Sequence, residues 1–348
     1  MNYELRIMNY LCTFAPMETK IIATKTAKII FPILLGGTIL YWMYRGEDFG
    51  RFIHVMTDEM DWTWMLLSFP FGILAQMFRG WRWKQTLEPI DEHPRTSTSI
   101  NAIFLSYAVS LIIPRLGEFT RCGVLKRYDG ISFSKALGTV VTERAIDTLL
   151  MGAVAGLTLL FELSIFGTFF KQTGTNLDTI LHSFSLTGYL VVAVCVMAIL
   201  ILLHILFSSL NIYSKVKATI DGVWQGIISL KDVRNLPLFI IFTLGIWVSY
   251  FLHYYLTFFC FDATSHLGLS CAMVTFVVGS IAVIVPTPNG AGPWHFAVKT
   301  MLILYGVIDE YALYFVLIVH TVQTMLVVAL GIYAWASLSF TKRINLKQ

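Results

Sequence analysis

Charged residues are scarce in this chain, and the first group that could do chemistry follows Pro114. Arg115, Glu118 and Arg121 are spaced three residues apart, so they share one face if the segment is helical. Pro114 ends the incoming helix, and Gly117 permits a turn. Two guanidinium groups around one carboxylate leave excess positive charge, which suits the oxygens of a phosphate. The alternative interpretation is a basic cytoplasmic loop that contacts anionic lipid.

A second group, Glu143, Arg144 and Asp147, lies inside an otherwise apolar span. Ionisable residues at such depth are costly and usually face the interior of a helix bundle or a wet cavity. The three charges cannot all neutralise one another. A carboxylate that is left over could take a proton or neutralise a cationic group on a substrate. The alternative is an ion pair that only pins two helices together.

A proline- and glycine-rich segment, 286–294, interrupts the apolar stretch 269–307. Unwound backbone at membrane depth persists only where it is buried or lines a cavity. Its free backbone groups, and the start of the helix near Trp294, are expected to contact a polar head group. The alternative is a loop outside the membrane. The residues expected to take part are Pro286, Pro288, Asn289, Gly290 and Gly292, with His295 and Lys299 on the following helix.

Arg79, Arg82 and Trp83 form a fourth group at the expected cytoplasmic end of the second span. Arginine and tryptophan commonly anchor helices at the membrane–water interface, and anchoring is the favoured interpretation. Recruitment of a phosphate head group from the inner leaflet is the other.

Several kinds of site are not predicted. The chain contains no Walker A, GxSxG or HExxH pattern, so neither nucleotide hydrolysis nor serine or zinc hydrolysis is indicated. Its 5 cysteines are scattered singly, which indicates neither a disulfide framework nor a metal site. We expect no cofactor, no metal and no nucleic-acid partner.

The elements that must position these residues are membrane-spanning helices. Of the 348 residues 56% are hydrophobic and 13% charged, whereas soluble proteins keep roughly a quarter of their residues charged. Apolar runs of about 20 residues, the length that crosses a bilayer core, recur along the chain. We therefore predict an all-α polytopic membrane protein with about six spans. They are expected at 27–44, 62–82, 136–162, 184–208, 237–261 and 311–338.

The distribution of lysine and arginine predicts how the chain is threaded. Basic residues before the first span and after the last one place both termini in the cytoplasm, under the positive-inside rule. The same rule makes two stretches, about 99–130 and 269–307, enter and leave on one side, as re-entrant helical hairpins. The two halves then form an inverted repeat of the kind found in transporters. Eight ordinary spans are the alternative.

The predicted organisation has five parts. A cytoplasmic tail (1–26) precedes the first membrane repeat (27–162), and a connecting region with one span (163–236) follows. The second membrane repeat (237–340) leads to a short cytoplasmic tail (341–348).

The order of these motifs resembles a known family. Pro114 to Arg121, Gly130-Ile131-Ser132, Lys135-Ala136-Leu137, Thr142 to Asp147 and Pro286 to Gly292 are similar to the lysylphosphatidylglycerol synthase transmembrane-region family, also called the flippase-like domain family. Arg79 and Arg82-Trp83 fit the same pattern, and the resemblance spans about 25–340. It implies a phospholipid or a polyprenyl-phosphate lipid as substrate.

Two departures from the family pattern bear on function. The soluble aminoacyl-transfer domain of the two-part synthases has no counterpart before Gln348, so we expect no synthase activity. Asn289 and the residues 291–294 stand where a more glycine-rich run and a glutamate are expected, and His295 partly replaces that glutamate.

The leading hypothesis is a lipid flippase or transporter of the cytoplasmic membrane. It would bind the anionic head group of a phospholipid or lipid-linked substrate in a charged cavity within the bilayer. One alternative is an intramembrane transferase or phosphatase that acts on a lipid-linked substrate. The other is a non-catalytic partner that presents lipid to a separate lipid-modifying enzyme.

Overall fold

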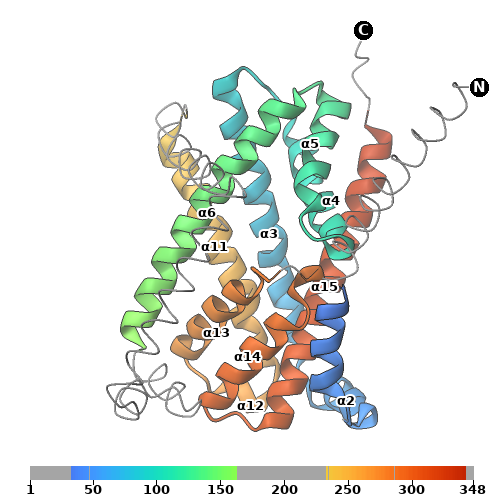
Figure 1. Cartoon of the computed structure of the whole chain (residues 1–348), viewed down its shortest axis with the longest axis vertical. Coiled ribbons are helices and arrows are strands. Elements are labelled where there is room, and N and C mark those ends of the chain that lie inside the picture. Colours follow the sequence, from blue (N-terminus) through green and yellow to red (C-terminus); the bar gives the residue numbers. More distant parts are fainter. Residues whose placement is uncertain (1–32, 47, 163–232, 234, 286, 342–348) are drawn as a thin grey trace, which may run out of the picture.

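The protein is built from helices that pack side by side (Figure 1). A computed structural model describes residues 33–46, 48–162, 233, 235–285 and 287–341, and these contain no strand. The helices are Ile33–Tyr44, α2 (Phe49–His54), a π-helix (Val55–Glu59), α3 (Trp62–Leu87), a 3-10 turn (Glu88–Ile90), α4 (Thr96–Ile112), α5 (Leu116–Asp129), α6 (Phe133–Phe161), α11 (Leu236–Tyr255), a 3-10 helix (Leu256–Cys260), α12 (Asp262–Ser265), α13 (Leu269–Ala282), η5 (Pro288–Gly290), α14 (Pro293–Leu304) and α15 (Asp309–Phe340).

Local signals set the ends of the helices that matter for the site. The Asp61 side chain accepts a hydrogen bond from the Thr63 amide at 2.8 Å and so caps α3. Gly130, with φ of 74°, ends α5 in the left-handed conformation that glycine adopts without steric cost. Pro293 begins α14, where its missing N–H has no partner to lose.

Three helices are long and apolar enough to cross a membrane: Phe133–Phe161, Leu236–Cys260 and Asp309–Phe340. They coincide with three of the expected spans, and the protein is a multi-pass helical membrane protein. The expected span 62–82 falls within α3, which is not among those three. Of the span expected at 27–44, residues 33–44 are described, as a helix. The tail 1–26 and the expected span 184–208 lie outside the described residues.

Two hairpins of short helices, α4–α5 and α13–α14, approach each other inside the bundle. Their helices have 17, 14, 14 and 12 residues, which at about 1.5 Å per residue is less than a hydrocarbon core of roughly 30 Å. In Figure 1 the first hairpin opens towards the top and the second towards the bottom. Their turns come together, since η5 at the turn of the second hairpin packs against α4.

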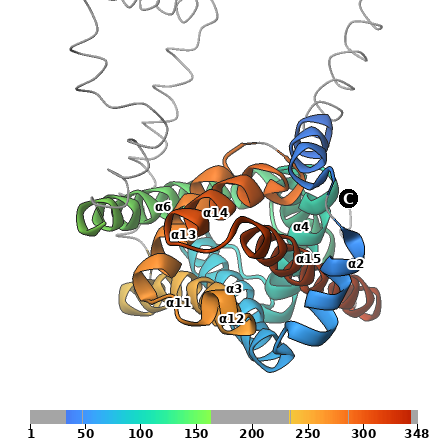
Figure 2. The ribbon, with the colours of Figure 1, turned by 90° about the horizontal axis from the view of Figure 1, so that it is seen from below.

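The long helices complete the arrangement around the two hairpins. In Figure 1, α11 runs opposite to α3, and α15 runs opposite to α6. Seen from below, α3 lies within the bundle, while α6 and α2 lie towards opposite sides (Figure 2). The main helix contacts join α3 to α11 and α4, and α15 to α4 and α14.

Gly117 has a different role from the turn expected for it. It lies in the first turn of α5, where an added Cβ would come within 2.1 Å of the Ser106 carbonyl oxygen on α4. The left-handed residue of the turn is instead Arg115, with φ of 66°. Gly117 therefore allows the two helices of the hairpin to pack closely.

Candidate functional site

A buried network of charges joins α3 to α6. Arg79 Nη1 lies 2.7 Å from Asp147 Oδ2, and Arg82 Nη1 lies 2.8 Å from Asp147 Oδ1. Arg82 Nε is also 3.5 Å from Glu143 Oε1. Asp147 and Glu143 are one turn apart on α6, so one face of that helix accepts both arginines of α3.

The same network continues into the first hairpin. Arg121 on α5 contacts Glu143 Oε2 through Nη1 at 2.7 Å and Glu118 Oε2 through Nη2 at 2.8 Å. Arg144 Nε lies 2.8 Å from Glu118 Oε1, and Arg144 Nη1 lies 3.9 Å from Asp147 Oδ2. Helices α3, α5 and α6 are thus connected by one set of ion pairs.

This network carries one excess positive charge. It contains four arginines (79, 82, 121 and 144) and three carboxylates (118, 143 and 147), so the sum is +4 − 3 = +1. The side chains of Arg82 and Glu143 have no exposed surface, whereas that of Arg144 is 44% exposed. Arg144 is therefore the most exposed member of the network, followed by Glu118 at 28%.

The network residues of α3 lie elsewhere than expected. Arg79, Arg82 and Trp83 were expected at the membrane–water interface, but their exposed fractions are 3%, 0% and 0%. Trp83 packs against Arg121, whose Cζ lies 4.7 Å from the centre of the tryptophan ring. The Trp83 indole N–H donates to Thr139 Oγ1 at 2.9 Å. The interface expectation is wrong because the charges of α6 and α5 draw these side chains into the protein.

Arg115 is not part of the network, although the sequence spacing grouped it with Glu118 and Arg121. It precedes the first helical residue of α5 in the left-handed conformation, so the helical spacing does not extend to it. Its side chain is exposed. Among the described residues, no carboxylate lies within salt-bridge distance of Arg115.

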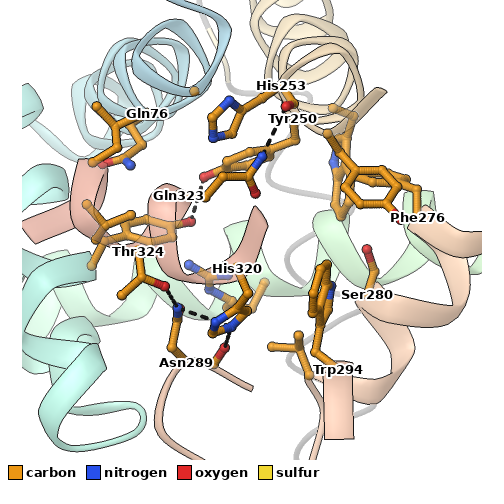
Figure 3. Close-up of a pocket in the computed structure, with 18 residues that line it drawn as sticks. Gln76, Tyr250, His253, Phe276, Ser280, Asn289, Trp294, His320, Gln323 and Thr324 are labelled. Carbon is orange, nitrogen blue, oxygen red and sulfur yellow. Dashed lines mark hydrogen bonds between the residues drawn. The ribbon is translucent and has the colours of Figure 1, made fainter. Parts of the chain in front are cut away.

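A cavity of about 440 Å³ lies between this network and the second hairpin. Figure 3 shows side chains from several helices pointing towards it. Arg144 forms part of its wall, and Asn289 and Trp294 of the second hairpin form another part. The remaining wall is aromatic or uncharged: Gly72, Gln76, Tyr107, Trp247, Tyr250, His253, Tyr254, Phe276, Ser280, Val283, His320, Gln323, Thr324, Leu326 and Val327.

The turn of the second hairpin is held to α15 by uncharged groups. Asn289 adopts φ of 52°, and its Nδ2 donates to Thr324 Oγ1 at 2.7 Å. His320 Nε2 lies 3.1 Å from the Asn289 carbonyl oxygen, as the dashed lines in Figure 3 mark. Gly290, also left-handed with φ of 70°, is buried beside Val283. Asn289 therefore lines the cavity, whereas Gly290 does not.

Other expected residues of the second hairpin lie away from the cavity wall. The buried His295 turns back towards the hairpin, where its Nδ1 accepts the Gly292 N–H at 3.3 Å. Lys299 Nζ lies 2.9 Å from Asp309 Oδ2, so the start of α15 neutralises it. Pro288 begins η5 and does not line the cavity. Pro286 lies outside the described residues.

The sequence motifs described above do not include most of the uncharged wall. His253 and His320 are single histidines in apolar spans and give no signal by themselves. The informative pattern is the spacing of their polar neighbours. His320, Gln323 and Thr324 have the i, i+3, i+4 spacing of one helical face on α15. Gln76 likewise precedes Arg79 by three residues on α3. A polar stripe along an apolar span is the pattern that could have found them.

Comparison with known proteins adds a family to this geometry. No curated protein and no solved structure matched the chain. The family described as "Lysylphosphatidylglycerol synthase TM region" matches residues 29–331, which is most of the chain. That stretch includes the buried charge network, both hairpins and the first 23 of the 32 residues of α15. The chain therefore belongs to the lysylphosphatidylglycerol synthase transmembrane-region family.

Proposed function

We propose that this protein is a lipid flippase of the cytoplasmic membrane that takes an anionic lipid head group into the cavity beside Arg144. One observation carries the proposal: Arg144 belongs both to a network with an excess positive charge and to the cavity wall. Membership of a family named for a lipid synthase supports a lipid as the substrate.

Arg144 is suited to a phosphate because much of its guanidinium group is uncommitted. Its Nε is used by Glu118 at 2.8 Å, while its closest Nη contact in the network is 3.9 Å. Guanidinium N–H groups bind phosphate oxygens in pairs. A phosphate at this position would also offset the one excess positive charge of the network.

We further propose that α4–α5 and α13–α14 are re-entrant hairpins that enter from opposite sides of the bilayer. Their short helices and meeting turns support this arrangement. The end of the molecule at which α3 and α5 terminate faces the cytoplasm, together with both chain termini. The positive-inside rule supports this orientation, since that end carries Lys84, Arg95, Lys126 and Lys135.

The test is a leaflet-resolved assay in proteoliposomes that contain fluorescent phosphatidylglycerol and a quencher that cannot cross the membrane. Arg144→Gln removes the charge at the cavity. Arg95→Gln is a matched control, because the side chains of Arg95 and Arg144 are both 44% exposed and both are paired with a carboxylate. A charged hydrogen bond contributes about 1.5–3 kcal/mol, so we expect Arg144→Gln to slow lipid movement about tenfold or more.

Arg95→Gln should move lipid at the wild-type rate. Equal rates for wild type and Arg144→Gln would overturn the proposal. We propose that the lipid crosses unchanged, so the recovered lipid should keep its mass. A mass change that depends on the protein would indicate an intramembrane enzyme instead. A bound lipid that never changes leaflet would indicate a protein that only presents lipid.

A further inference from the structure

The wall of the cavity has an unusual balance of chemical groups. Among the described residues that line it, Arg144 carries the single formal charge, and none is an aspartate, a glutamate or a lysine. The three nearby carboxylates, Glu118, Glu143 and Asp147, are each engaged by arginine within 2.8 Å. The wall can therefore neutralise a phosphate, but it offers no free carboxylate to a cation.

Amide and indole groups of this wall lack hydrogen-bond partners. Gln76 is 3% exposed, and its Oε1 has no partner in the part of the chain that the structure describes. The buried Nε1 of Trp247 also has none there. Leaving a buried donor or acceptor unpaired is costly. Gln76 Oε1 is an acceptor and Trp247 Nε1–H is a donor. A hydroxyl group can pair with either, because it both donates and accepts. An ammonium group can serve only the acceptor.

Aromatic side chains supply most of the remaining surface. Tyr107, Trp247, Tyr250, Tyr254, Phe276 and Trp294 all line the cavity. Such faces can hold either the C–H face of a polyol or a cation. Two of them already face a cation, because Arg79 Cζ lies 5.9 Å from the Tyr107 ring and 6.0 Å from the Tyr250 ring. A second cation here would meet the repulsion of Arg79 and Arg144, whereas an uncharged polyol would not.

We infer that the cavity selects a lipid whose phosphate carries an uncharged, hydroxyl-rich group, such as a polyol or a sugar, and rejects cationic aminoacylated head groups. Arg144 binds the phosphate, while Gln76 and Trp247 bind hydroxyl groups. Gln323, which donates from Nε2 to the His253 carbonyl oxygen at 3.0 Å, and Ser280 add polar groups to the same wall (Figure 3). This inference rests on the proposed function and specifies its substrate.

The experiment compares four lipids with identical acyl chains in the proteoliposome assay. Phosphatidylinositol and phosphatidylglycerol are anionic and carry hydroxyl groups. Phosphatidylmethanol has the same charge without them, and lysylphosphatidylglycerol is cationic. We expect the first two to cross several times faster than phosphatidylmethanol and at least tenfold faster than the cationic lipid. Equal rates for phosphatidylglycerol and its lysylated form, or for phosphatidylinositol and phosphatidylmethanol, would overturn the inference.

Two variants test which residues give the preference for hydroxyl-bearing lipids. Gln76→Leu and Trp247→Phe should each remove most of the advantage of phosphatidylinositol over phosphatidylmethanol. Thermal unfolding of each purified variant reports whether it is folded. Variants that keep the full preference would contradict the assigned residues. If Arg144→Gln leaves all four rates unchanged, the proposed function itself fails, which is a different result from a loss of selectivity.

Discussion

The two hairpins are held by opposite kinds of contact where they approach the cavity, while the ion pair of Lys299 with Asp309 lies on α14, away from the turn of the second hairpin. In the first, Glu118 and Arg121 of α5 are locked into ion pairs with α6. In the second, the turn is attached to α15 by the uncharged contacts of Asn289 with Thr324 and His320. Both hairpins have left-handed residues in their turns, Arg115 in the first and Asn289 in the second. The contrast therefore lies in the charges and not in the backbone.

This difference decides what each hairpin can do. Removing one member of a buried ion-pair network leaves its partner charged and desolvated, which costs about 3–5 kcal/mol. An uncharged hydrogen bond contributes only about 0.5–1.5 kcal/mol. The first hairpin is thus fixed to α3 and α6 by charge, whereas the turn of the second is attached to α15 by weaker, uncharged bonds.

The largest effect is expected when the network loses a buried carboxylate. Glu143→Gln removes the charge that faces both Arg82 and Arg121, so the network changes from +1 to +2. Leaving a buried charge without its partner costs about 3–5 kcal/mol. We expect a large fall in the thermal unfolding temperature of the purified protein in detergent.

Glu118→Gln is the control for that measurement. Its side chain is 28% exposed, whereas that of Glu143 is fully buried. Water can reach the position that the Glu118 carboxylate occupies. Glu118→Gln should therefore lower the thermal unfolding temperature clearly less than Glu143→Gln. If both variants are equally stable, burial does not decide how much each carboxylate of the network contributes to stability. The contrast between a charged first hairpin and an uncharged second one would then have no energetic basis.

The next largest effect is expected from a change in side-chain volume, and not in charge, within the first hairpin. In Gly117→Ala the new Cβ would lie 2.1 Å from the Ser106 carbonyl oxygen and 2.3 Å from Ser110 Oγ. Overpacking of this kind costs about 1–3 kcal/mol. Thermal unfolding should show a clear loss of stability as α4 and α5 separate.

Gly123 on the same helix supplies the comparison, because an added Cβ there meets nothing within 4 Å. Alanine is favoured over glycine inside a helix by about 0.5–1 kcal/mol, so Gly123→Ala should be neutral or slightly stabilising. A destabilisation equal to that of Gly117→Ala would show that the close contact between α4 and α5 is not what Gly117 provides.

The sequence predicted the charged half of the site better than the uncharged half, for physical reasons. Glu143, Arg144 and Asp147 stand out because charge inside an apolar span is costly. Their partners Arg79 and Arg82 resemble interface anchors until α6 is known to pack beside α3. The grouping of Arg115 with Arg121 failed because one left-handed residue precedes the helix.

The fold, too, could be predicted from the sequence only in part. The apolar runs that became α6, α11 and α15 were evident from composition alone. His320 and Thr324 were missed because uncharged polar residues cost less in a span and so stand out less. Lys299 was expected to face a head group, but Asp309, at the start of the next helix, pairs with it. Such a pairing depends on the short turn between α14 and α15.

The smallest effect concerns the Asn289 side chain in the second hairpin. Asn289→Gly removes the bond to Thr324, but glycine still accepts φ of 52°, so the loss should be about 1 kcal/mol. Asn289→Ala removes the same bond and adds the left-handed penalty of about 1–2 kcal/mol. Thermal unfolding should therefore rank wild type first, the glycine variant second and the alanine variant last. Equal stability of the two variants would mean that Asn289 is not held left-handed, and the turn would then be set by its glycines and prolines alone.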